Sequence, residues 1–102
     1  MHVTAIAEAR RFSLERPEVR TLVDTPDLKS ELLCFEAGQR LEPVAAAHTI
    51  TYLVLEGEAL VRADAVQLRL GQGKLLRVDA GERYLLENAG GGLLVVLAST
   101  PA

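Results

Sequence analysis

Short apolar runs separated by turn residues are the feature that most constrains the fold of this chain. Residues 66–70, with the sequence VQLRL, show the pattern best, because every second side chain is apolar, as in a strand with one buried face. Turn residues, many of them glycine, recur at intervals of about 8 to 12 residues, which predicts an all-β sandwich or barrel rather than a parallel α/β sheet. The expected strands cover residues 19–23, 30–35, 51–55, 59–62, 66–70, 74–78, 82–87 and 93–98.

The beginning of the chain differs from this pattern. Residues 3–12 are rich in alanine and place Val3, Ile6 and Arg10 at helical spacing, so a short helix or an irregular lead-in is expected within residues 1–18. A chain of 102 residues fits one domain, residues 1–102, because a core of this size cannot usefully be divided in two. Within that domain we expect the barrel core to occupy residues 30–99.

Composition and charge exclude several classes of function. The net charge is -3 and the two signs are interspersed, so no basic stripe is available to a nucleic acid. No apolar run approaches the roughly 20 residues of a membrane-spanning helix, and residues 1–11 lack the apolar core of a signal peptide. We therefore expect a cytoplasmic protein that contacts neither nucleic acid nor a membrane. The single cysteine, Cys34, lies in an apolar run, which excludes an internal disulfide and predicts a buried, inert thiol.

Two glycine-bearing motifs follow one another in the expected barrel core. In the first, Gly38 and Gly57 flank a segment that ends in the strand-like sequence YLVLEGE. In the second, Gly73, Gly81 and Asn88 are regularly spaced. In their order and spacing, these motifs resemble the two motifs of the cupin superfamily. The resemblance implies a small double-stranded β-helix, the RmlC-like jelly-roll barrel.

The resemblance also implies where a metal ion would bind. Cupins use two histidines and a glutamate of the first motif and a histidine of the second, and these positions hold Val44, Ala46, Ile50 and Tyr84 here. Asp79 likewise replaces a proline of the second motif. A catalytic first-row metal needs about three imidazole or carboxylate ligands, which hydrocarbon side chains cannot supply. The sequence therefore predicts no metal site and no other cofactor.

His48 is the one weak candidate for a metal ligand. It lies two residues from both Ala46 and Ile50, so in an extended chain it would face inward with them. A turn in this segment would instead place His48 at the barrel rim, bonded to backbone or solvent. We favour the rim position, because one imidazole alone makes a poor metal site.

Tyr84 exchanges a ligand imidazole for a phenol. A buried phenol needs a hydrogen-bond partner, and we expect a backbone carbonyl, His48 or Asn88 to provide it. Alternatively, Tyr84 orients an oxygen atom of a small ligand. In the register of the resemblance, Leu41 and Val54 also face inward, and the candidates for lining a ligand pocket are Val44, Ala46, His48, Ile50, Tyr52, Tyr84, Leu86 and Asn88.

A mostly apolar lining with a few polar tips is typical of small-molecule pockets. We therefore expect a metal-free domain without catalytic residues that binds a small apolar or aromatic ligand or has a regulatory role. The resemblance implies a homodimer, which would also cover edge strands. Two alternatives stay open: a metal-dependent cupin enzyme, such as a small dioxygenase or isomerase, that uses His48, and a structural interaction domain with a filled barrel.

Overall fold

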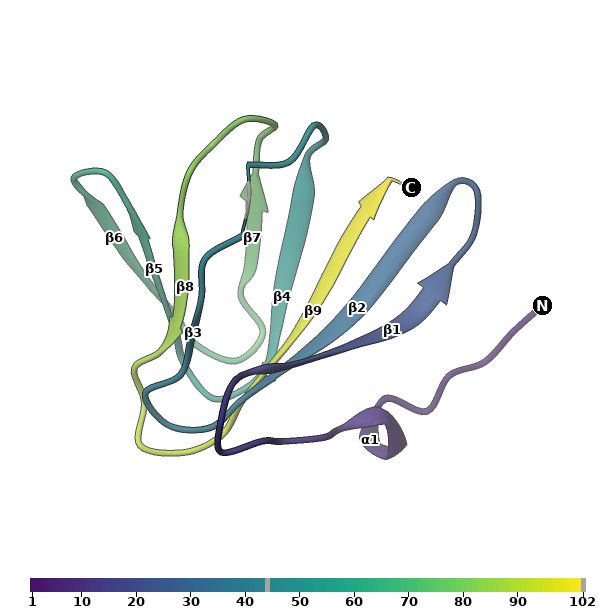
Figure 1. Cartoon of the computed structure of the whole chain (residues 1–102), viewed down its shortest axis with the longest axis horizontal. Helices are drawn as coiled ribbons and strands as arrows, with labels where there is room; N and C mark the ends of the chain where they lie inside the picture. The colour runs from purple at the N-terminus through teal and green to yellow at the C-terminus, as the bar shows by residue number, and fades with distance from the viewer. Residues whose placement is uncertain (44, 102) are drawn as a thin grey trace.

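The computed structural model describes residues 1–43 and 45–101, which form two antiparallel sheets that face each other (Figure 1). The elements are α1 (Ile6–Ala9), β1 (Glu18–Asp24), β2 (Leu28–Phe35), β3 (Arg40–Leu41), β4 (Ile50–Glu56), β5 (Ala59–Ala63), β6 (Val66–Leu70), β7 (Leu75–Val78), β8 (Leu85–Asn88) and β9 (Leu94–Pro101). One sheet has the strand order β1-β2-β9-β4-β7 and the other has the order β3-β8-β5-β6. The all-β architecture expected from the turn spacing is confirmed. In the described part of the chain, no helix has the length and apolarity needed to cross a membrane.

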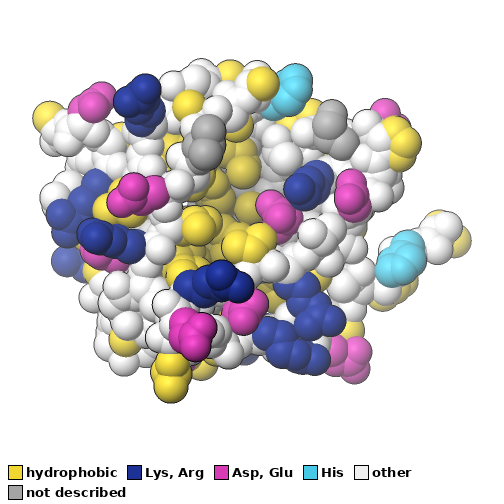
Figure 2. Space-filling model, in the orientation of Figure 1, with side chains coloured by type: hydrophobic (Ala, Val, Ile, Leu, Met, Phe, Trp, Pro, Cys, Tyr) yellow, Lys and Arg dark blue, Asp and Glu magenta, His cyan; other side chains and the backbone are white. Residues whose placement is uncertain are grey.

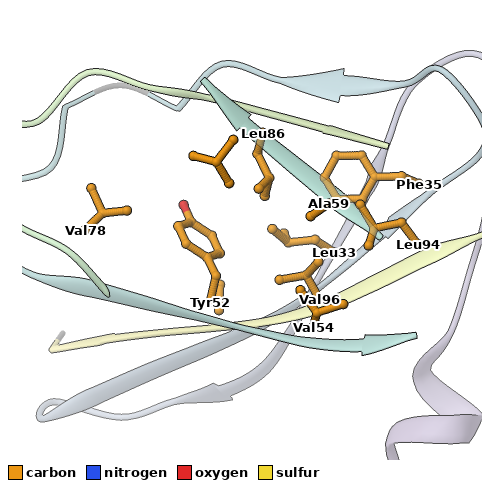
Figure 3. Close-up of a cluster of buried hydrophobic side chains, with 11 residues drawn as sticks. Leu33, Phe35, Tyr52, Val54, Ala59, Val78, Leu86, Leu94 and Val96 are labelled. Atoms are coloured by element: carbon orange, nitrogen blue, oxygen red, sulfur yellow. The ribbon is translucent and has the colours of Figure 1, made fainter. Parts of the chain in front are cut away.

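The main core lies between the two sheets, where alternate side chains of each strand meet (Figure 3). On β2, Leu33 and Phe35 point inward, and on β4, Tyr52 and Val54 do the same. This arrangement follows from the two-residue period of a strand, which sends every second side chain to the same face. The buried members of this core are Leu33, Phe35, Tyr52, Val54, Ala59, Val61, Val78, Leu86, Leu94, Val96 and Ala98.

A second, smaller core lies on the other side of the five-stranded sheet. The single helical turn α1 places Ala9 against Leu32, Cys34 and Val95, whose side chains have the opposite parity to the main core. Cys34 is only 1% exposed, so its predicted burial is confirmed. Burial raises the pKa of its thiol above the ordinary value, which keeps it in the unreactive protonated form.

The glycines of the two motifs occupy the turns expected from their spacing. Gly38, Gly57, Gly73 and Gly81 all have positive φ, between 78° and 86°. At Gly57 the need for glycine is also steric, because a Cβ atom there would lie 2.2 Å from the carbonyl oxygen of Leu93. The two motifs therefore mark turns that the chain cannot make readily with other residues.

Two elements differ from the strands expected from the sequence. The strand expected at 82–87 begins only at Leu85, because Asp79 and Glu82 close a turn before it. In that turn the Glu82 amide donates to the Asp79 carbonyl, and the Asp79 amide donates to the Glu82 carboxylate at 2.7 Å. The short strand β3 was not expected. It has two residues, too few to show a period, and it exists through its pairing with β8.

Candidate functional site

A hollow opens between β1 and β3, the edge strands of the two sheets at one side of the barrel. Figure 2 shows hydrophobic side chains at the bottom of a depression between the sheets. The cavity has a volume of about 220 Å³. We call it the mouth cavity, and its lining residues are Val19, Glu31, Leu33, Leu41, Pro43, Ala46, Ile50, Tyr52, Tyr84 and Ala98.

Two tyrosines form the polar part of the inner wall. Tyr52 faces inward from β4 and is 3% exposed, whereas Tyr84, just before β8, is only partly buried. Their hydroxyl groups are hydrogen-bonded, and their rings pack edge to face with centroids 5.9 Å apart. The partner expected for Tyr84 was a backbone carbonyl, His48 or Asn88, and this prediction is wrong. The strand period placed Tyr52 inside the barrel but could not show which residue it would meet.

Both phenols stay protonated in this environment. Burial is the main cause that raises the pKa of each of them. Either hydroxyl can donate in the bond between them, so this bond uses one of the two O–H protons. The neutral pair therefore has one O–H donor left to offer to the mouth cavity, which both tyrosines line.

Tyr84 also borders a second hollow. This space of about 310 Å³ lies between β6 and β7, the edge strands at the opposite side of the barrel. Its wall is mainly apolar, with Val66 and Leu68 from β6 facing Leu76 and Val78 from β7. Tyr84 therefore lines both this space and the mouth cavity.

The structure brings together four of the residues proposed to line a pocket. Ala46, Ile50, Tyr52 and Tyr84 all border the mouth cavity, as does Leu41 from the wider inward-facing set. Leu86 and Val54 face inward as well, but both lie in the packed core and do not line this cavity. Val44 lies outside the described residues.

His48 does not join this group. A bend at Ala47 and His48 interrupts the alternation before β4 begins, and the His48 side chain is exposed. The mouth cavity is lined by Ala46 and Ile50 on either side of this bend, without His48. His48 would face inward with Ala46 and Ile50 only if the chain were extended through this segment. The bend breaks that alternation, so His48 does not face inward.

Asn88 faces inward, but its side chain bonds to the backbone of neighbouring segments. It is 1% exposed, and its side-chain amide donates to the carbonyls of Phe35, at 3.3 Å, and Gly92, at 2.8 Å. Its side-chain oxygen accepts from the Gly90 amide at 3.2 Å. Asn88 therefore ties the turn after β8 to the end of β2 and does not line the mouth cavity.

Glu31 is the charged member of the five cavity residues that were not predicted from the sequence, and the other four are Val19, Leu33, Pro43 and Ala98. It lies on β2 two residues before Leu33 and shares the inward parity of Leu33 and Phe35. Its cross-strand neighbour on β9 is Ala98, which also lines the cavity. The strand period could have found Glu31, because the expected strand at 30–35 already contained it.

The donor set around the cavity does not fit a metal ion. In the register of the resemblance to cupins, two of the metal-ligand positions would be Ala46 and Ile50, whose side chains have no lone pair, and a third would be the hydrogen-bonded phenol of Tyr84. Within residues 1–43 and 45–101, no three His, Cys, Asp or Glu side chains converge in a way that could hold an ion. A first-row metal needs about three such donors at one point.

Neither a protein-family model nor a curated protein matches the chain, but solved structures match it over nearly its whole length. The protein TT1209 from Thermus thermophilus is 20% identical, with a TM-score of 0.91 over 99% of this chain and 97% of that one. An uncharacterized conserved protein with a double-stranded β-helix domain from Klebsiella pneumoniae is 18% identical, with a TM-score of 0.91 over 99% and 90% of the two chains. An RmlC-like cupin protein from Desulfovibrio desulfuricans is 21% identical, with a TM-score of 0.86 over 99% and 96%. The fold of this chain is therefore the small jelly-roll barrel of the RmlC-like cupins.

Proposed function

We propose that this cupin-fold chain is a small-ligand-binding domain that acts without a metal ion and without catalysing a reaction. The mouth cavity carries this proposal, because apolar side chains form most of its wall and the hydrogen-bonded pair of Tyr52 and Tyr84 has one O–H donor left to offer. A mainly apolar wall with few polar groups is typical of small-molecule sites. Its volume of about 220 Å³ lies below the roughly 300 to 1,000 Å³ usual for drug-sized ligands, so the expected ligand is smaller.

The two alternatives receive less support from the same geometry. A metal-dependent enzyme would need His48 beside other donors, but His48 is exposed in a bend and Ala46 and Ile50 flank it. A filled barrel would leave no hollow beside Ala46 and Tyr84, whereas both residues border the mouth cavity. A ligand-binding domain accounts both for the open cavity and for the tyrosine hydroxyl groups in its wall.

Filling the cavity tests the proposal. Ala46→Leu adds a larger side chain to the lining of the cavity and should abolish binding of small aromatic molecules. Benzyl alcohol, benzylamine and benzoate are suitable probes, with binding measured by ligand-observed NMR and by the shift in melting temperature. The matched control is Ala47→Leu, which adds the same side chain at the adjacent exposed residue outside the cavity.

We expect the wild type and Ala47→Leu to bind at least one of these probes and Ala46→Leu to bind none. Equal binding by all three proteins would show that the probes bind elsewhere. The absence of binding to the wild type by any probe would refute the proposed function for small aromatic ligands.

A further inference from the structure

The charge of Glu31 is the feature of the mouth cavity that the proposed function leaves unexplained. Its side chain is 28% exposed and belongs to the inward face of β2, where Leu33 and Phe35 are buried. Among the described residues that line the cavity, Glu31 is the only one with a formal charge. A carboxylate in a mainly apolar wall loses hydration, so its position has an energetic cost unless a partner compensates it.

Little in the described structure compensates this charge. Lys29, two residues earlier on the same strand, places its Nζ atom 3.9 Å from a Glu31 carboxylate oxygen. This distance exceeds the 2.7 to 3.2 Å of an N–H···O hydrogen bond, so the ion pair is weak and forms no hydrogen bond. The Lys29 side chain is also 43% exposed and is not among the residues that line the mouth cavity. The carboxylate therefore retains acceptor capacity toward the cavity.

The negative charge also acts on the inner wall. Burial and the bond to Tyr84 are the larger causes that raise the pKa of Tyr52, and the charge of Glu31 adds to them. The charge of Glu31 thus acts on Tyr52, which lines the same cavity. An anionic ligand would meet this field without a cation in the wall to balance it, whereas a cation would be stabilised by it.

We propose that the mouth cavity selects small organic cations, in which an ammonium group pairs with Glu31 and an apolar or aromatic body occupies the space between Leu41, Ile50 and Tyr52. A carbonyl or ether oxygen on the same molecule would accept the O–H proton that the bond between Tyr52 and Tyr84 leaves unused. This inference rests on the proposed function, since it names the class of ligand for the same cavity.

Three probes with the same aromatic body separate charge from shape. Benzylamine is a cation at neutral pH, benzyl alcohol is neutral and benzoate is an anion. We expect the wild type to bind benzylamine about tenfold more tightly than benzyl alcohol, because a hydrogen bond between two charged groups is stronger than one with a neutral hydroxyl. Benzoate should bind more weakly than either. Titration calorimetry or ligand-observed NMR on the full chain gives the three dissociation constants.

Substitution of Glu31 tests the source of the preference. Glu31→Gln keeps the shape of the side chain, so it should remove the tenfold preference for benzylamine and leave benzyl alcohol binding within about twofold. Glu15→Gln is the matched control, because it removes the same charge from an exposed residue outside the cavity. Lys29→Gln should strengthen benzylamine binding, since it removes the ammonium that competes for Glu31.

The outcomes distinguish the inference from the proposed function. If benzyl alcohol and benzoate bind as tightly as benzylamine, or if Glu31→Gln and Glu15→Gln weaken benzylamine equally, the selection of cations is refuted while ligand binding stands. If none of the three probes binds the wild type, the proposed function and the inference both fail. The comparison among probes on the wild type does not depend on the folding of any variant.

Discussion

At the scale of single residues, the bond between Tyr52 and Tyr84 is the contact inside the barrel with the clearest energetic consequence. The Tyr52 hydroxyl is buried, and among the described residues its hydrogen-bond partner is Tyr84. Tyr84 is only partly buried and borders open cavities, so its oxygen can exchange a protein partner for water. The Tyr52 hydroxyl therefore relies on Tyr84 for its hydrogen bond more than the Tyr84 hydroxyl relies on Tyr52.

Single and double substitutions of this pair should lower the free energy of unfolding by different amounts. Tyr84→Phe leaves a buried donor without a partner and should lower the free energy of unfolding by about 1 to 3 kcal/mol. Tyr52→Phe should cost less, about 0.5 to 1.5 kcal/mol, because water can reach Tyr84. The double variant should be more stable than Tyr84→Phe alone, since it removes the orphaned hydroxyl. Urea unfolding measures all three, and a double variant less stable than Tyr84→Phe would contradict this account.

Residue positions could be predicted from the sequence where a strand is regular and not where it bends. The alternation along β4 correctly placed Ile50, Tyr52 and Val54 on the inward face. The alternation does not extend to His48, because the bend at residues 47 and 48 changes the direction of the chain, and His48 is exposed as the favoured rim position predicted. The contact between Tyr52 and Tyr84 could not be predicted either, because it depends on how one sheet faces the other.

At the scale of elements, the turns are better specified by the sequence than the strand ends. The positive φ of the motif glycines is a local property, so glycine spacing alone located these turns. The start of β8 depends instead on the turn that Asp79 and Glu82 close, which involves a side-chain bond that no period reveals. The two-residue β3 likewise depends on β8 being in place.

Two glycine substitutions separate backbone conformation from close packing. Gly57 and Gly73 have nearly equal φ values, +86° and +85°, but only Gly57 has atoms within 4 Å of the position of an added Cβ. Gly73→Ala should cost about 1 to 2 kcal/mol, the strain of a left-handed conformation. Gly57→Ala should cost at least about 3 kcal/mol more or prevent folding, because the Leu93 carbonyl must move. Equal thermal stability of the two variants would contradict the steric explanation.

At the scale of the whole molecule, the outer face of the five-stranded sheet is only partly covered. The helical turn α1 packs near Leu32 and Cys34. Beyond it, Leu97, Leu53 and Leu75 lie in register on β9, β4 and β7 and form one row across the sheet. Leu97 and Leu53 are partly buried, and Leu75 at the end of the row is 66% exposed. A contiguous apolar row on a sheet face is typical of an association surface.

We propose that two copies of the chain form a homodimer through this row, as the resemblance to cupins implied. A two-fold axis would place Leu53 and Leu75 against the same residues of the second copy and bury them on both sides.

Leu75→Lys would bring an unpaired charge into that interface, so it should shift the protein from dimer to monomer at micromolar concentration. Val66→Lys is the control, because Val66 is 54% exposed on β6 of the other sheet. Analytical ultracentrifugation should show a dimer for the wild type and for Val66→Lys. A monomeric wild type would refute the dimer, and loss of the dimer in Val66→Lys alone would move the interface to the other sheet.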